Sequence, residues 1–225
     1  MAKLGIEHEN LDYKAYQVIK EMIINRKLLP GRKIPQEKLA SDLGISRTPL
    51  VNALKYLEHE KLIKSMPRRG YFVRLFGYEE MISIFELREI LEGLAARRAC
   101  HEITDEQKKR LQCFFKKFRG VKEIGDYKAY AAEDRLFHNF VTDVGSKEFL
   151  KSILETCNIV TFSYQLDATE GLVRPPIDTL EEHLSIIDAI SKRDELKAEE
   201  LMRLHLRKSL EVLKRDFEEK DMAYT

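Results

Sequence analysis

The chain has 225 residues, of which 44% are hydrophobic and 34% are charged; this is the composition of a globular protein and excludes a disordered or membrane-spanning chain. Its formal net charge of +1 conceals an asymmetry, because residues 1–77 carry 15 Lys and Arg against 8 Asp and Glu, whereas residues 78–225 carry 24 against 30. Three cysteines without a CxxC pair, no signal-peptide pattern and no long apolar run predict a cytoplasmic protein with reduced thiols and no membrane partner.

The charge asymmetry also suggests two domains. A basic segment joined to an acidic one indicates polyanion binding at one end. The boundary in charge coincides with a change of hydrophobic periodicity near Phe76-Gly77-Tyr78. We therefore expect a small domain over residues 1–77 and a larger one over residues 78–225.

Residues 1–77 begin with the pattern of a helix-turn-helix. Apolar residues recur at helical spacing in a first helix, which ends before Pro30 and Gly31: Ala15, Val18, Ile19, Met22 and Ile23. A second helix over residues 36–43 is closed by Gly44, and Ser46 is a suitable N-cap for a third helix with Pro49 in its first turn. Two short helices separated by a tight turn predict a nucleic-acid-binding module.

A basic hairpin follows these helices. Two strand-like runs, residues 62–66 and 71–75, flank the turn Pro67-Arg68-Arg69-Gly70. A helix-turn-helix followed by a hairpin with two arginines at its tip is a winged helix. Both parts present cations to a phosphate backbone.

The amino-acid sequence of this region resembles that of the DNA-binding domain of the GntR family of bacterial regulators. The similar runs are Leu29-Pro30-Gly31-Arg32-Lys33-Ile34, residues 39–50 with their Ser46-Arg47-Thr48-Pro49 core, and Arg69-Gly70-Tyr71-Phe72-Val73. The resemblance implies that Arg47 and Thr48 contact base edges and phosphates of double-stranded DNA in the major groove. It also implies that Gly70 lets the wing tip enter the minor groove and that Arg32 and Arg69 contact phosphates. Without this pattern, an exposed first helical turn would be the simpler interpretation of Arg47 and Thr48.

One departure from the family concerns base preference. Val51-Asn52 stands where the family usually has Arg-Glu, so a DNA-contacting arginine is missing. Val51 could instead face a thymine methyl group, and Asn52 an adenine. The operator of the family therefore should not be assigned to this chain.

From Tyr78 onward helical periodicity dominates. A long first helix has its apolar positions at Ile82, Phe85, Leu87, Leu91, Leu94 and Ala95. A capping box of Thr104 and Gln107 opens a second helix, which contains Leu111, Phe114, Phe115 and Phe118. Further helices are expected over residues 126–144, 146–166, 177–191 and 194–217. The predicted fold is mostly α: an N-terminal winged helix-turn-helix and a C-terminal all-α antiparallel bundle of six or seven helices.

Four potential metal ligands lie on the inward faces of three of these helices: Asp134, His138, His183 and His205. Asp134 and His138 are four residues apart and so share one helix face. Each histidine taken alone is more often a hydrogen-bonded core residue, but burying all four groups requires mutual bonding or a cation. One carboxylate and three imidazoles suit a divalent metal, with zinc as our first choice and nickel, manganese or iron as alternatives.

The same segments resemble the FCD effector domain of the FadR-like branch of the GntR family. The similar runs are residues 85–95, Asp134-Arg135-Leu136-Phe137-His138, Glu182-His183-Leu184 and Met202-Arg203-Leu204-His205-Leu206. The resemblance implies that the aspartate and the three histidines bind a divalent metal inside the bundle. The chain departs from the family at Gly145-Ser146-Lys147, where Ser-Gly-Asn is usual; we expect little effect on the fold.

These observations predict a regulator rather than an enzyme. Open metal positions could take a small organic acid as effector, oriented by Arg88, although Arg88 could equally form an intrahelical pair with Glu92. Such a regulator is expected to bind its operator as a homodimer. Two alternatives remain: a purely structural metal, or a metal-dependent hydrolase. The chain lacks the adjacent His-Asp pair and the His-Glu-x-x-His motif of such hydrolases.

Overall fold

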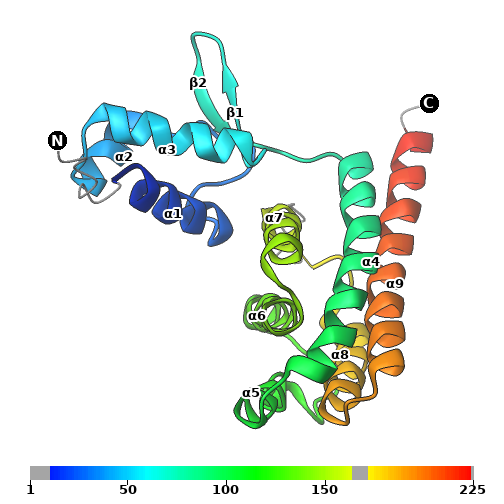
Figure 1. The fold of residues 1–225 in the computed structure, drawn as a ribbon. Coiled ribbons are helices and arrows are strands. Elements are labelled where there is room, and N and C mark those ends of the chain that lie inside the picture. Colours follow the sequence, from blue (N-terminus) through cyan, green and yellow to red (C-terminus); the bar gives the residue numbers. More distant parts are fainter. Residues whose placement is uncertain (1–10, 164–171, 224–225) are drawn as a thin grey trace, which may run out of the picture. The chain divides into compact units, whose positions relative to one another are not determined.

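The computed structural model describes residues 11–163 and 172–223, so residues 164–166 of the expected helix 146–166 lie outside the described part. It divides into two compact units, Met1–Leu75 and Phe76–Thr225 (Figure 1). The boundary between the two units falls after Leu75, two residues before the position expected from the sequence. Each unit is described by itself below.

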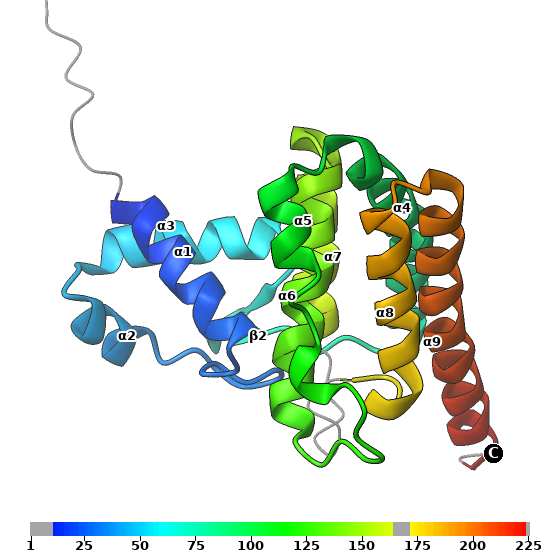
Figure 2. The same cartoon turned by 90° about the horizontal axis from the view of Figure 1, so that it is seen from below.

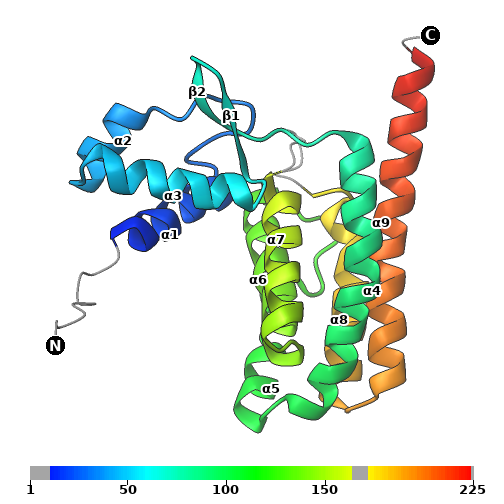
Figure 3. The ribbon, with the colours of Figure 1, turned by 45° about the horizontal axis from the view of Figure 1, so that its top comes forward.

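The first unit is a winged helix. It contains α1 (Leu11–Ile24), α2 (Gln36–Leu43) and α3 (Arg47–His59), followed by the antiparallel strands β1 (Ile63–Met66) and β2 (Gly70–Val73), which form the wing (Figure 3). The segment before α2 runs along β2, because the Ile34 N–H donates to the Tyr71 carbonyl (2.9 Å) and the Val73 N–H donates to the Arg32 carbonyl (3.0 Å). These bonds tie the wing to the helices.

The packing of α1 corrects one expectation. Ile19 and Ile23 are buried as predicted, but Tyr16 replaces Val18 on the buried face and Val18 is 41% exposed. The reason is that α1 turns its face toward α3, where the Tyr16 hydroxyl donates a hydrogen bond to Glu60 just beyond that helix. The sequence showed the helical period, but not which side of the stripe would meet α3.

The turn between α2 and α3 follows the predicted capping pattern. Gly44 closes α2 with φ +64°, a left-handed conformation that glycine adopts without strain. Ser46 occupies the N-cap position of α3 with an extended backbone, although its side chain makes no capping hydrogen bond. The turn therefore depends mainly on the glycine.

The second unit is a helical bundle (Figure 2). Its helices are α4 (Tyr78–Glu102), α5 (Asp105–Leu111), α6 (Tyr127–Gly145), α7 (Glu148–Ser163), α8 (Pro176–Ser191) and α9 (Glu195–Ala223). The long helices α4 and α9 pack along each other, and α4 also contacts α6, α7 and α8. The structure confirms the mostly helical fold, and α9 runs past the expected end at residue 217. Within the described ranges, no helix has both the length and the apolar character that a bilayer crossing requires.

The second helix of this unit is shorter than predicted. It begins with the expected capping box, but it ends at Leu111, and Phe118 lies in a separate 3-10 turn, η1 (Lys116–Phe118). Phe115 adopts φ +61°, and its N–H donates to Glu133 on α6 (3.0 Å). Apolar residues recur at helical spacing over residues 111–118, which is why a longer helix was predicted. The contact with α6 instead turns the chain and brings the Phe115 and Phe118 rings into the core.

The buried face of α4 also differs from the prediction. Leu87 is 49% exposed, while Arg88 and Glu92 are 3% and 1% exposed. The buried positions are Met81, Phe85, Arg88, Glu92, Gly93, Ala95, Ala96, Ala99 and Cys100. The buried face of α4 could not be predicted from hydrophobic residues alone, because the Arg88–Glu92 ion pair occupies the centre of that face.

Candidate metal centre and nucleic-acid interface

The four predicted metal ligands meet in the second unit. Asp134 and His138 come from α6, His183 from α8 and His205 from α9. Each offers one potential ligand atom, and these atoms lie within 4.8 Å of one another. The three imidazoles are buried, and the Asp134 side chain is 17% exposed.

The imidazoles surround the Asp134 carboxylate. Asp134 Oδ1 lies 3.2 Å from His183 Nε2 and 3.9 Å from His138 Nε2. The ring centroid of His205 lies 4.5 Å from that of His183 and 5.3 Å from that of His138. Three separate helices therefore contribute to one buried polar centre in the bundle.

Each histidine uses its Nδ1 atom for a hydrogen bond away from this centre. His138 Nδ1 lies 2.5 Å from Glu92 Oε2, and His205 Nδ1 lies 2.9 Å from Glu182 Oε2. His183 Nδ1 lies 3.0 Å from the Tyr130 hydroxyl. Because the Nδ1 atoms are engaged, the Nε2 atoms remain for a shared ion; such outer partners orient metal-binding imidazoles.

The two outer carboxylates are themselves held by cations. Arg88 Nε donates to Glu92 Oε1 (2.6 Å), and Arg88 Nη1 donates to Thr161 on α7 (3.3 Å). Glu182 accepts hydrogen bonds from Arg174 (2.8 and 3.0 Å) and Lys208 (2.7 Å). These cations offset the negative charge of the outer carboxylates.

The electrostatic environment favours the protonation states of metal ligands. Burial raises the pKa of Asp134, but the close His183 ring and the charge of His138 outweigh this and hold the pKa below its ordinary value. Burial lowers the pKa of His183, and burial together with the neighbouring His183 lowers the pKa of His205 to about 3. At neutral pH the Asp134 carboxylate is therefore anionic and the His183 and His205 imidazoles are neutral, the forms that metal binding requires.

The residues present fit a metal ion. His183 Nε2 is buried and, within the described part of the chain, has no hydrogen-bond partner. Ligands at about 2.0–2.2 Å from one ion would be separated by roughly 3 to 4.4 Å. The observed separations, up to 4.8 Å, lie close to this range and would narrow slightly around an ion. The cluster could hold a metal ion, and its donor set does not distinguish zinc from its alternatives.

Three residues of this site were not among the predicted ligands or contacts: Glu92 as a partner of His138, Tyr130 and Glu182. Glu92 was considered only as the intrahelical partner of Arg88, and that pair is present. A signal for Glu182 existed, because it precedes His183, but its partner His205 is 23 residues away. Only the packing of α8 against α9 brings the two together.

The predicted DNA-contacting residues of the first unit lie mainly on its surface. Arg47 and Thr48 are exposed in the first turn of α3, and Arg32 is exposed before α2. Arg69 is exposed at the wing, where its guanidinium lies 5.5 Å from the Phe72 ring centroid. Gly70 begins β2 with φ +92°, a conformation that a larger residue rarely adopts.

Asn52 differs from the others. Its Nδ2 donates to Asp12 Oδ2 on α1 (2.9 Å), and the side chain is half-buried. An adenine contact would have to replace or share this bond. Val51, beside it on α3, is also half-buried.

Comparisons with known families match both units. The family described as bacterial regulatory proteins, gntR family, matches residues 11–73, and the FCD domain family matches residues 83–208.

Similar full-length proteins are also bacterial regulators by name. The uncharacterized HTH-type transcriptional regulator YdhC of Bacillus subtilis is 28% identical over 206 residues, which cover 91% of each chain. The HTH-type transcriptional repressor RspR of Escherichia coli is 24% identical over 91% of this chain and 89% of its own. A solved structure, E. coli McbR/YncC, shares the fold with a TM-score of 0.74 at 20% identity, covering 92% of this chain and 98% of that one.

Proposed function

Because the chain belongs to the GntR family of bacterial regulatory proteins and carries an FCD domain, we propose that a small organic acid at the metal centre controls its binding to DNA. The family is one of DNA-binding transcriptional regulators and not of enzymes. We propose that it works beside the chromosome, in the cytoplasm. The observation that supports an effector site is the convergence of Asp134 and three imidazoles inside the bundle.

The effector class follows from the ligand count. Four protein ligands would leave two positions open on an octahedral ion, and a carboxylate can fill them. One anionic ligand against a divalent cation leaves positive charge at the centre, because Glu92 and Glu182 are already balanced by their own cations. A small anion is therefore favoured over a neutral molecule.

Arg88 is the predicted effector contact, and its pairing limits that role. Glu92 already accepts the Nε–H, so an effector carboxylate would have to use the remaining N–H groups of the guanidinium. The variant Arg88→Lys separates the two roles. A lysine can still neutralise Glu92 but cannot bind two carboxylates in the same geometry. Loss of the effector response with metal content unchanged would support a contact; a wild-type response would exclude it.

We propose that Arg32, Arg47, Thr48, Asn52, Arg69 and Gly70 form the DNA interface. A selection from random duplexes would give an operator. Arg47→Ala is then expected to abolish specific binding without changing metal content, while Lys61→Ala removes the same charge from the turn before β1 and should have a small effect. Arg47→Lys tests base recognition, since losing a bidentate base contact costs about 1–3 kcal/mol. Operator binding by Arg47→Ala as tight as wild type at equal salt would refute the assignment.

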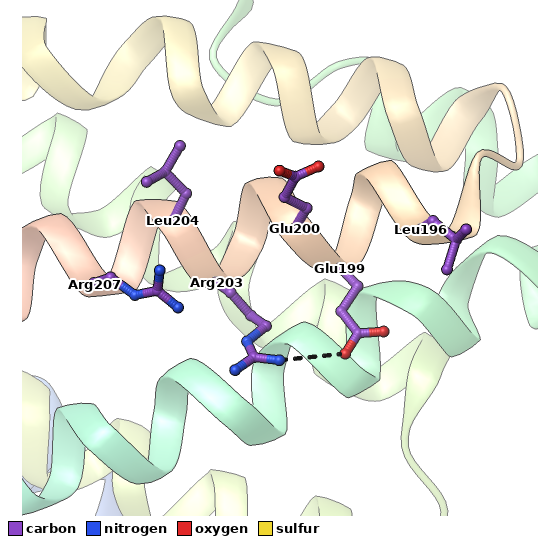
Figure 4. Close-up of a pocket in the computed structure, with 6 residues that line it drawn as sticks. All are labelled: Leu196, Glu199, Glu200, Arg203, Leu204 and Arg207. Carbon is purple, nitrogen blue, oxygen red and sulfur yellow. Dashed lines mark ion pairs between the residues drawn. The ribbon is translucent and has the colours of Figure 1, made fainter.

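We propose a homodimer formed through α4 and α9. A pocket along α9 is lined by Leu196, Glu199, Glu200, Arg203, Leu204 and Arg207 (Figure 4). Leu196 is 72% exposed, and on α4 Ile90 is 56% exposed. If two α9 helices pair antiparallel about a two-fold axis, the glutamates of one chain face the arginines of the other. A second copy of the chain thus fits this face by apolar area and by exchange of the ion pairs that Glu199, Arg203 and Arg207 form within one chain.

The dimer is tested by size measurement in solution. Ile90→Glu places a charge in the proposed interface and is expected to give a monomer that binds a palindromic operator weakly. Phe149→Glu is the matched control, because Phe149 on α7 is 87% exposed and lies on another helix. A dimeric Ile90→Glu protein would contradict the proposed face.

A purely structural metal is the remaining alternative. Metal analysis of His138→Ala and His205→Ala is expected to show loss of the ion, and unchanged stoichiometry would refute the site. DNA release by small carboxylates, tested over a panel with the metal-loaded protein, then separates sensing from a structural role. Carboxylate-induced release from DNA that requires the metal supports the effector site. A bound metal with DNA binding that no carboxylate changes supports the structural alternative.

A further inference from the structure

His183 differs from the other two histidines in its Nδ1 partner. His138 and His205 each have a carboxylate there, whereas His183 has the neutral hydroxyl of Tyr130. A carboxylate can only accept, so it fixes the proton on Nδ1, but a hydroxyl can donate or accept. The tautomer of His183 must therefore be set by something beyond Tyr130.

We propose that Tyr130 and Thr179 are positioning residues that keep the proton of His183 on Nδ1, so that its Nε2 presents a lone pair to the centre. The proposal rests on the metal site of the proposed function, but part of its test uses metal-free protein.

The proton can be followed along a chain of hydrogen bonds that ends at a backbone carbonyl. The Pro176 carbonyl can only accept, so the Thr179 hydroxyl donates to it (3.2 Å). Thr179 has one hydroxyl hydrogen, and its oxygen must therefore accept from the Tyr130 hydroxyl (2.8 Å). The Tyr130 hydrogen is then used, and the Tyr130 oxygen accepts from His183 Nδ1–H (3.0 Å).

The other side of the ring agrees with this assignment. A neutral imidazole with its proton on Nδ1 has a lone pair on Nε2. Asp134 Oδ1 lies 3.2 Å from His183 Nε2, yet this atom makes no hydrogen bond within the described residues. A proton on Nε2 would meet the Asp134 carboxylate outside hydrogen-bond geometry, so the assignment depends on the bonds at Nδ1, which leave a lone pair on Nε2 for a cation.

The ring plane is fixed independently. Phe115 stacks on His183 with the ring centroids 4.6 Å apart and the planes 2° from parallel. Phe115 is fully buried, and its backbone is held by Glu133. Stacking sets the plane of the imidazole, and the Tyr130 bond turns Nδ1 toward the phenol, so that Nε2 lies toward Asp134.

Two substitutions interrupt the chain at different points. Tyr130→Phe keeps the aromatic ring that packs against Phe115 and Phe118, but it leaves Nδ1–H without an acceptor. Thr179→Val keeps the shape but removes the oxygen that accepts from Tyr130. The Tyr130 hydroxyl is then free to donate to His183 Nδ1, which moves the imidazole proton to Nε2.

The experiment has two readouts. Nitrogen-15 NMR of metal-free protein, with the His183 signals assigned by their absence in His183→Asn, reports which nitrogen carries the proton. We expect Nδ1–H in the wild type and Nε2–H in Thr179→Val. Zinc affinity, measured by competition with a chromophoric chelator, should fall about 10- to 100-fold in Tyr130→Phe and Thr179→Val.

Controls separate positioning from general damage. Thr179→Ser restores the hydroxyl and should restore both the tautomer and the affinity. Tyr127→Phe removes a phenol from the same helix and should change neither. An Nε2–H tautomer in the wild type would overturn the inference, as would zinc affinities within twofold of wild type for both chain-breaking variants. If the wild type does not bind zinc or the alternative ions, the proposed metal site fails, while the tautomer measurement still decides the proton chain.

Discussion

Gly145 allows α6 to cross α4 at close range. A Cβ atom at this position would lie 1.9 Å from the Ala95 carbonyl oxygen and 2.7 Å from its carbon. Gly93 on α4 is also crowded, but by the flexible Arg203 side chain, whose Cγ would lie 2.5 Å from the Cβ. Gly125 has open space around it. A side chain is therefore excluded by backbone at Gly145, opposed only by a flexible side chain at Gly93, and sterically unopposed at Gly125.

The first prediction uses this series. Gly145→Ala should lower the free energy of unfolding by about 3 kcal/mol or more, because two helix backbones must separate. Gly93→Ala should change it by about 1 kcal/mol or less, since Arg203 can move and alanine favours the helix. Thermal and denaturant unfolding of both, with Gly125→Ala as control, would measure this. Equal stabilities for Gly145→Ala and Gly125→Ala would show that α4 and α6 can separate at Gly145 without loss of stability.

The sequence predicts the role of a residue well where that role depends on its neighbours in the chain. Thr104 and Gln107 form the predicted capping box, with Thr104 Oγ1 accepting from the Gln107 N–H (3.2 Å) and Gln107 Oε1 accepting from the Thr104 N–H (3.0 Å). The close approach at Gly145 could not be found in this way. Its partner, Ala95, is far along the chain.

At the scale of elements, the C-terminal end of α4 is capped by a side chain from the loop between α8 and α9. Arg193 lies between α8 and α9, and its Nη1 donates to the Cys100 carbonyl (2.6 Å) and the His101 carbonyl (3.3 Å), while its Nη2 donates to the Ile103 carbonyl (2.9 Å). Carbonyls in the last turn of a helix lack intrahelical partners and carry partial negative charge. A guanidinium satisfies both needs.

The second prediction concerns this cap. Arg193→Ala should lower the free energy of unfolding by about 1–3 kcal/mol, because it removes charge-assisted hydrogen bonds from partly buried carbonyls. Lys192→Ala is the neighbouring control. Among the residues that the structure describes, Lys192 pairs with Asp188 on the surface, so its loss should cost less than about 0.5 kcal/mol. Similar unfolding midpoints for the two variants would contradict the capping role.

Element boundaries show where sequence patterns fail. Helix α2 ends as predicted because Gly44 closes it locally, and α3 begins directly after Ser46, the predicted N-cap. Residues 111–118 kept helical spacing and yet leave the helix at Leu111, because the Phe115 N–H is satisfied by Glu133 instead of by its own helix. A distant acceptor replaced the local one, and no local pattern records that.

At the scale of the whole molecule, the stability of the bundle should depend on its metal. An ion that binds only the folded state stabilises it, by about 2.7 kcal/mol at a free concentration 100 times the dissociation constant. The third prediction is that zinc raises the melting temperature of the wild type and that a chelator reverses this. His205→Ala should show no such response. A metal-independent melting temperature in the wild type would count against the site.

The fourth prediction is the pH dependence of the metal-free protein. The pKa of His205 is lowered to about 3 by burial and by His183, against an ordinary value of 6.5. The unfolded chain therefore binds this proton first as the pH falls, and stability should decrease from about pH 6.5 downward. Below about pH 4.5 the carboxylates of Glu92 and Asp134, whose pKa values are also lowered, add to the loss. Melting curves between pH 7 and 4 would show the decrease, and constant stability over this range would contradict it.

The sequence by itself determined the mostly helical architecture, the winged helix and the identities of the four potential ligands, because periodicity, capping residues and ligand chemistry are local properties. Tertiary structure alone decided the turn at Phe115, the burial of the Arg88–Glu92 pair and the Nδ1 partners of the three histidines. Each of these depends on contacts between different helices, and their geometry follows from packing. The proton chain from His183 to the Pro176 carbonyl is the clearest case, since it exists only where α6 meets α8.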